Sequence, residues 1–119
     1  MQDFRNLKVW EKAHRLTVDV YKSSAGFPRE GLYGLTSQMR RCSKSIGANI
    51  AEGCCRKGDA ELSRFLQIAM GSASELEYEL LLAHDLAILQ STQYNHLSKE
   101  VTDVKRMLAA LTNRLRADN

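Results

Sequence analysis

Two stretches of the chain repeat a position at alternating steps of three and four residues, which is the spacing of one face of an α-helix. The first stretch consists of Leu32, Leu35, Met39, Cys42, Ile46, Asn49 and Gly53. The second consists of Tyr94, Leu97, Val101, Val104, Leu108, Leu111 and Leu115. Each predicts a helix with one narrow buried seam. The first seam differs in having an asparagine where a helix bundle usually has an aliphatic side chain.

Turn and cap signals divide the chain into four predicted helices, over about residues 7–25, 30–52, 60–89 and 92–115. We expect Gly26 to provide a left-handed cap before Pro28, and Glu30 to lie near the start of the second helix. Gly53 should follow the end of that helix. The expected N-caps are Asp59 for the third helix and Ser91 or Thr92 for the fourth.

Short connections between four helices predict an all-α fold, an antiparallel up-down-up-down four-helix bundle forming a single domain over residues 1–119. Gly71, inside the third helix, predicts close packing against a neighbouring helix. Apolar residues between Leu80 and Leu89 cover more than one helical stripe. An isolated bundle would leave some of them in water, so we expect a homo-oligomer.

The N-terminal residues, the lengths of apolar runs and the cysteines indicate where the protein is located in the cell. The first residues lack the apolar core of a signal peptide, and no apolar run approaches the roughly 20 residues that span a bilayer. We therefore expect a cytoplasmic protein with no membrane association. The three cysteines form no closed disulfide framework, and Cys42 falls on the seam as a small apolar group. Cys54 and Cys55 could form a strained disulfide or bind a metal, but inert reduced thiols are the simpler interpretation.

Catalytic and metal-binding patterns are weak. Glu11 and His14 have the Glu-x-x-His spacing of bundle proteins with two metal ions, but such a site needs the pair twice. Neither His84 nor His96 has a glutamate three residues before it. No nucleophile elbow, phosphate loop or zinc-ligand spacing is present. We expect a non-enzymatic protein with no cofactor and no metal.

Asn49 lies in a motif with Glu52 and Gly53. A buried amide needs hydrogen-bond partners, so we interpret Asn49 as a structural residue that fixes helix register or oligomer state, or that bonds a neighbouring helix or the loop after Gly53. Direct contact with a ligand is the alternative. Glu52 lies four residues before Arg56, which predicts a local ion pair.

Basic side chains provide the main functional candidate. The net charge is +3, but the bases gather in one part of the chain. The candidate nucleic-acid-binding residues are Arg40, Arg41, Lys44, Arg56, Lys57 and Arg64. They could neutralise backbone phosphates with little sequence preference, because no aromatic residues are interleaved to stack bases. A basic surface that only keeps the protein in solution is the alternative.

Four segments together resemble a known family. Residues 4–10 (FRNLKVW), 33–41 (YGLTSQMRR), 45–53 (SIGANIAEG) and 64–72 (RFLQIAMGS) resemble the four-helix-bundle proteins encoded within bacterial 23S rRNA intervening sequences. The match covers nearly the whole chain in order, and the Asn-Ile-Ala-Glu-Gly segment is its most specific part.

The resemblance implies a small up-down bundle that assembles as a ring-shaped homopentamer. A related protein, the accessory variability determinant of diversity-generating retroelements, is a basic pentameric bundle that binds nucleic acid and a reverse transcriptase. The leading hypothesis is therefore RNA or DNA binding through the basic residues. The alternative is a scaffold that docks a protein partner and has no role with nucleic acid.

Overall fold

Four long α-helices make up almost all of the described chain. The computed structural model describes residues 2–28 and 33–117, and within these ranges it contains no strand. A 3-10 turn, η1 (Phe4–Asn6), precedes α1 (Lys8–Ser24). The other elements are α2 (Tyr33–Cys55), α3 (Asp59–Asp85) and α4 (Ser91–Ala117). The all-α prediction is confirmed.

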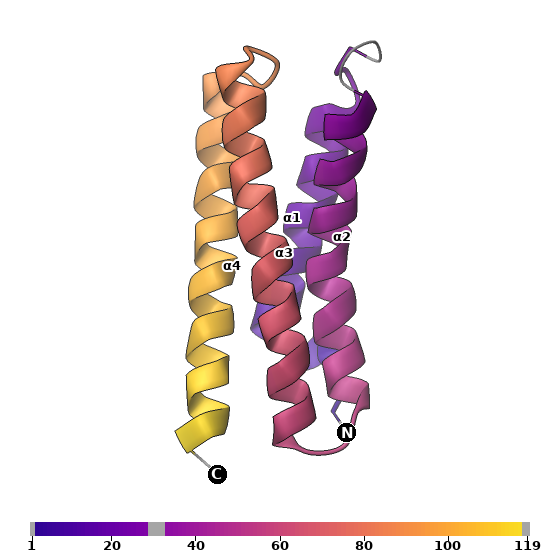
Figure 1. Ribbon diagram of the computed structural model, residues 1–119, viewed down its shortest axis with the longest axis vertical. Coiled ribbons are helices and arrows are strands. Elements are labelled where there is room, and N and C mark those ends of the chain that lie inside the picture. The colour runs from indigo at the N-terminus through magenta and orange to yellow at the C-terminus, as the bar shows by residue number, and fades with distance from the viewer. Residues whose placement is uncertain (1, 29–32, 118–119) are drawn as a thin grey trace.

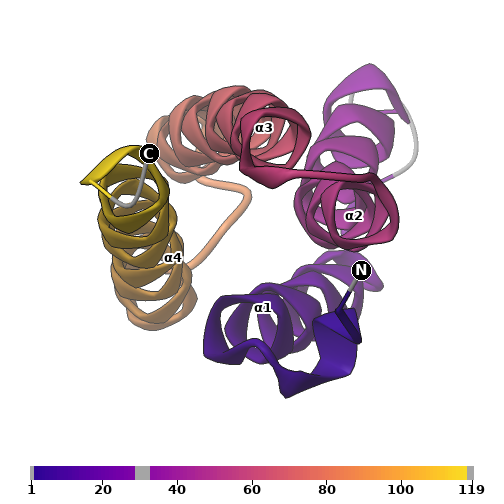
Figure 2. The same cartoon turned by 90° about the horizontal axis from the view of Figure 1, so that it is seen from below.

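The helices alternate in direction along the long axis, so both termini lie at the same end of the molecule (Figure 1). Viewed along that axis, the four helices surround a common core, and α4 closes the bundle against α1 (Figure 2). Lys12 of α1 contributes to this closure through ion pairs with Glu100 at 2.7 Å and Asp103 at 3.5 Å on α4. The bundle is 47 Å long and 20 Å across. No helix in the described ranges is both long and apolar enough to cross a membrane.

The two predicted seams form much of the core. On α4, the seam positions from Leu97 to Leu111 are buried, and Tyr94 and Leu115 pack against them. On α2, Met39, Cys42 and Ile46 are buried as expected, whereas Leu32 lies outside the described residues.

The prediction that Asn49 occupies the seam is wrong. Ile50 is fully buried in its place, and Asn49 is only half-buried. An α-helix has 3.6 residues per turn, so a strict three-four alternation drifts by about 20° per heptad relative to the helix face. After Ile46 the buried face of α2 has therefore moved on to Ile50.

Helix ends differ from the sequence prediction at several glycines. Gly26 is not a left-handed cap, because α1 ends in right-handed backbone at Ala25, and Phe27 donates to the Ser24 carbonyl. Gly53 does not end α2, which continues to Cys55. Gly58, with φ of 86°, makes the reversal into α3. The expected placement of Glu30 lies outside the described residues.

The caps of the last two helices also differ. Asp59 is the first residue of α3 and not its N-cap, which is Gly58; its carboxylate still lies in the first turn, where it complements the helix dipole. Ser91 is likewise the first residue of α4. Helix α3 ends at Asp85, not Leu89, because Ala87 adopts φ of 61° and Ile88 donates back to the Ala83 carbonyl.

Gly53 lies where α2 and α3 approach most closely near their connection. A Cβ atom there would lie 2.9 Å from Leu62 Cδ1 and 3.0 Å from Phe65 Cβ. Gly71 shows the opposite: a Cβ atom would meet nothing within 4 Å, so its predicted close packing within the chain is wrong.

Because of these two environments, the same glycine-to-alanine substitution should change the free energy of unfolding in opposite directions at Gly53 and Gly71. Gly53→Ala should destabilise the bundle by about 1–2 kcal/mol, because overpacking against the rigid Phe65 Cβ outweighs a helix-propensity gain of about 1 kcal/mol. Gly71→Ala, the matched control, should gain about 1 kcal/mol. Urea unfolding measures both changes in stability. It is done at a protein concentration where light scattering gives the two variants the same mass. Equal effects of the two substitutions would contradict it.

Candidate nucleic-acid interface

The six basic candidates form two groups at different levels of the bundle. Arg40, Arg41 and Lys44 lie on α2 beside the end of α1. Arg56 and Lys57 lie in the α2–α3 connection, and Arg64 follows in α3. Arg40 and Arg56 are separated by sixteen residues, about 24 Å along a helix. The structure therefore does not place the six in one patch.

The group at the α2–α3 connection is largely neutralised by neighbouring acids. Arg56 Nε bonds Glu52 Oε2 at 3.0 Å, which confirms the predicted ion pair. Arg64 Nε bonds Glu61 Oε2 at 3.0 Å, and this contact holds the Glu61 pKa below its usual value. Both guanidinium groups also lie over the Phe65 ring, at 5.3 and 4.5 Å from its centroid. Only Lys57, which is exposed, has no partner among the described residues.

The group on α2 borders an open surface hollow of about 580 Å³ between α1 and α2. Arg40 is fixed in the wall of this hollow. Its Nε donates to Ser24 Oγ at 2.9 Å, and a terminal nitrogen donates to the Tyr21 carbonyl at 3.3 Å. The guanidinium carbon lies 4.9 Å from the centre of the Tyr21 ring. Arg40 therefore links α1 to α2 and places a fixed positive charge at the hollow.

Arg41 and Lys44 differ from Arg40 because their charges are not compensated. Both side chains are exposed and line the hollow. Neither forms a hydrogen bond or ion pair with any part of the chain that the structure describes. The hydroxyl groups of Thr36 and Ser37 lie in the same lining. Two free cations beside one fixed cation and two hydroxyl groups suit an anion such as a phosphate.

Aromatic side chains reach this hollow from α1 and the segment after it. Tyr21 is 39% exposed, and Phe27 is half-buried in the same lining. In the sequence no aromatic residues are interleaved with the bases, because Tyr21 and Phe27 lie more than a dozen positions before Arg40. Only the packing of α1 against α2 brings them next to Arg40.

Asn49 has partners that fit a structural role. Its side-chain nitrogen donates to both the carbonyl and Oγ of Ser45, each at 2.9 Å. Ser45 Oγ in turn lies 2.9 Å from Ser72 Oγ on α3. Asn49 therefore supports a polar bridge between α2 and α3, and it does not line the hollow.

The Glu11 and His14 pair does not form a cluster of metal-ligating groups. Glu11 pairs with Arg15 at 3.8 Å, and His14 stacks on Trp10 with ring centres 5.0 Å apart. All three cysteines are free, with Cys54 buried and Cys55 exposed.

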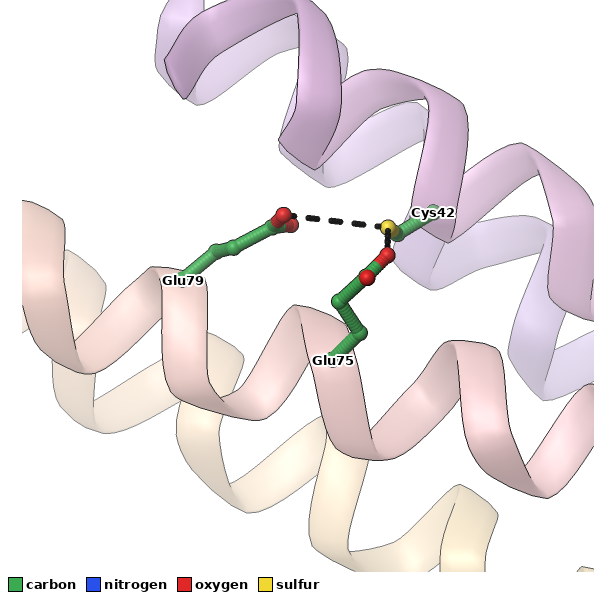
Figure 3. A group of neighbouring side chains, drawn as sticks. All are labelled: Cys42, Glu75 and Glu79. Atoms are coloured by element: carbon green, nitrogen blue, oxygen red, sulfur yellow. Dashed lines mark hydrogen bonds between the residues drawn. The ribbon is translucent and has the colours of Figure 1, made fainter.

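The sequence did not predict one cluster of metal-ligating side chains, formed by Cys42, Glu75 and Glu79. Cys42 was predicted to act as an apolar seam residue, but its Sγ faces the carboxyl groups of Glu75 and Glu79 on α3 (Figure 3). Two glutamates four residues apart on one helix were a visible signal, but their relation to Cys42 depends on how α2 packs against α3.

Residues 5–110 match the family model described as 23S rRNA-intervening sequence protein. The chain belongs to this family. A crystal structure of a protein of unknown function is also similar; that protein is from the S23 ribosomal protein family of Bacteroides thetaiotaomicron VPI-5482. It has a TM-score of 0.80 and 27% sequence identity, and the match covers 88% of this chain and 95% of that one. A search of curated proteins found no match.

For this member of the 23S rRNA-intervening sequence protein family, the matched range includes all six basic candidates and the hollow. The resemblance seen in the sequence segments is thereby confirmed, together with the helical fold that it implied.

Proposed function

We propose that this cytoplasmic 23S rRNA-intervening sequence protein acts by binding and not by catalysis, and that it binds the phosphate backbone of RNA or DNA at the α1–α2 hollow. The observation that carries the proposal is the pair Arg41 and Lys44, which are exposed beside the fixed guanidinium of Arg40 and have no ionic partner among the residues that the structure describes. The proposal narrows the six sequence candidates to three. Arg56 and Arg64 already have carboxylate partners, and Lys57 does not line the hollow.

The same geometry supports binding with little sequence preference. Phosphate contacts release counterions and fix position, whereas sequence is read at base edges. The lining offers cations, hydroxyls and aromatic faces, and none of its helices presents a recognition-helix motif. Tyr21 and Phe27 would stack on unpaired bases, which favours single-stranded or structured RNA over a continuous duplex.

We further propose that the protein is a homo-oligomer, with the pentameric ring that the family resemblance implies. Three of the large apolar side chains exposed in the described ranges lie on α3, namely Ile68, Tyr78 and Leu81, and a fourth belongs to its C-cap residue, Leu86. Tyr78 is 62% exposed and Leu86 53%. Burial of this face between copies would remove them from water, and a ring would repeat the hollow around one axis, adding up its modest charge.

The double variant Arg41→Glu/Lys44→Glu should bind labelled structured RNA at least about tenfold more weakly than the wild type, and its salt dependence should be shallower. Arg40 is left unchanged because its bonds to α1 would confound the result. Fluorescence anisotropy at low and high salt measures the affinity.

Lys8→Glu/Arg106→Glu is the matched control for charge. Both residues are exposed and outside the hollow, and the change in net charge is the same. This control should retain most of the binding. Equal weakening in both double variants would mean that only net charge matters, and unchanged binding in the hollow variant would contradict the site.

A protein-docking scaffold is the second candidate, and the exposed apolar face of α3 favours it. If that face binds a different protein, the purified chain should remain monomeric and should not bind RNA in a salt-dependent manner. Light-scattering mass with and without RNA separates the two functions. The nucleic-acid proposal requires an RNA complex that dissociates at high salt, and the ring proposal requires an oligomer of defined mass.

A further inference from the structure

One thiol and two carboxyl groups converge between α2 and α3. Figure 3 shows the carboxyl groups of Glu75 and Glu79 both turned toward Cys42 Sγ from the facing helix. The two glutamates lie one helical turn apart on α3, so they present their carboxyl groups on the same side. One ligand atom from each of the three residues lies within 4.8 Å of the other two.

Hydrogen bonding inside this cluster is incomplete. The Cys42 thiol donates to Glu75 Oε2 and lies 3.8 Å from Glu79 Oε2. Glu79 is only 4% exposed, and its second oxygen, Oε1, is buried with no hydrogen-bond partner in the described part of the chain. Buried carboxylate oxygens almost always have a partner, so Oε1 points to a group that binds it.

Compensating positive charge is also missing. Neither Glu75 nor Glu79 forms an ion pair with a described lysine, arginine or histidine, whereas Glu77 between them bonds Lys105 at 2.9 Å. Burial raises the Cys42 pKa, and the hydrogen bond to Glu75 raises it further. Burial also raises the Glu79 pKa to about 6, against a lowering by the Cys42 hydrogen bond and with a further increase from Glu75. Without a cation, the cluster must therefore hold protons.

We propose that Cys42, Glu75 and Glu79 form a binding site for a divalent transition metal, with Zn²⁺ as the preferred ion. The donor set is one thiolate and two carboxylates. A thiolate disfavours Mg²⁺ and Ca²⁺, which take oxygen ligands, and carboxylates disfavour Cu⁺, which takes soft ligands. Zn²⁺ accepts both donor types in tetrahedral geometry.

Distances within the cluster fit such an ion. A tetrahedral Zn²⁺ holds sulfur and oxygen ligands about 3.6 Å apart, as follows from bond lengths of about 2.3 and 2.1 Å. Cys42 Sγ and Glu79 Oε2 are 3.8 Å apart, so the Glu79 carboxyl group needs little movement to bind the ion and to bring its unpartnered Oε1 against it as well. The Glu75 side chain is exposed and must move slightly away from Sγ. Its exposure also provides access for the ion and for a water as fourth ligand.

Binding replaces protons by the ion. The Cys42 S–H bond breaks, its proton goes to solvent, and the thiolate sulfur binds the metal; any proton on Glu79 leaves in the same way. No redox change occurs. The metal would join α2 to α3 at the middle of the bundle, and its affinity should fall as the pH is lowered. This site does not depend on the nucleic-acid proposal.

Cobalt provides the direct test, because Co²⁺ bound to a thiolate has a near-ultraviolet sulfur-to-metal charge-transfer band that Co²⁺ bound to oxygen alone lacks. The full chain, freed of metal by a chelator and kept reduced, is titrated with Co²⁺. We expect this band to saturate at one ion per chain and to disappear when Zn²⁺ is added. Zn²⁺ should also raise the melting temperature.

Two variants and one control assign the ligands. Cys42→Ser should lose the charge-transfer band. Glu79→Gln should weaken binding by more than the about 10–100-fold typical of losing an outer-shell partner. Cys55→Ser, which removes an exposed thiol, should leave the spectrum unchanged. Circular dichroism confirms that each variant is folded. A wild-type spectrum without the band, or a band that survives Cys42→Ser, would overturn the proposal.

Discussion

Replacing Leu80 by alanine should lower the free energy of unfolding by about 2–5 kcal/mol. Leu80 is fully buried in the core that α3 shares with the other helices. The substitution removes three side-chain carbon atoms from a close-packed interior and leaves a cavity, so both the transfer free energy and the packing contacts are lost. Urea unfolding followed by circular dichroism measures the change.

The neighbouring residue, Leu81, provides a control with the same leucine-to-alanine substitution. Leu81 is 42% exposed, so Leu81→Ala should change the stability of a single chain by less than about 0.5 kcal/mol. In an oligomer held together by the outer face of α3, Leu81→Ala should instead reduce the mass measured by light scattering. Similar losses of stability in both variants at a concentration where each is monomeric would contradict the assigned burial.

The second large effect is a dependence of stability on pH that comes from Glu79. Burial raises its pKa from the usual 4.5 to about 6, so the folded protein binds this proton more tightly than the unfolded chain does. The resulting stabilisation is fully present below about pH 4.5 and is lost as the pH rises through 6. A difference of 1.5 pKa units corresponds to about 2 kcal/mol.

Glu79→Gln tests this, since the amide cannot ionise. In the presence of a chelator, the variant should gain up to about 2 kcal/mol relative to the wild type between pH 4.5 and pH 7. Glu77→Gln, a substitution on the same helix that removes the ion pair with Lys105 of α4, should show no such gain. A difference between wild type and Glu79→Gln that does not change with pH would contradict the interpretation.

Helix number and direction follow from the sequence with few ambiguities. The α4 seam from Leu97 to Leu111 is buried as its spacing predicted, because apolar residues at three-four spacing can be removed from water together only on one side of a helix. Helix ends were less predictable. Gly53 was expected to end α2, but its small size serves the approach of Leu62 and Phe65, which lie in the next helix. Local sequence does not distinguish a glycine that ends a helix from one that admits a neighbour.

The surplus of apolar residues near the end of α3 was also visible in the sequence. Leu81 and Leu86 are exposed, whereas Leu80 and Leu89 are buried, as expected for a segment with more apolar positions than one bundle can cover. Leu80 and Leu81 both lie within α3, so the rotation of that helix decided which of them is buried. The end of α3 at Asp85 and the left-handed backbone of Ala87 placed Leu86 and Leu89. The number of apolar residues in this segment predicted that some would be exposed. The three-dimensional structure determined which ones.

The sequence by itself determined four amphipathic helices, their alternating order and the presence of excess bases on α2, because these depend on residue spacing within about two turns of helix. Tertiary structure alone decided which distant side chains meet. It placed Tyr21 and Phe27 beside Arg40 and gave Arg56 and Arg64 a shared aromatic surface. Within residues 2–28 and 33–117, it left Arg41 and Lys44 without an ionic partner. It also turned Cys42 toward Glu75 and Glu79. Such contacts depend on the rotation and register of one helix against another, which the summed packing of the whole core determines.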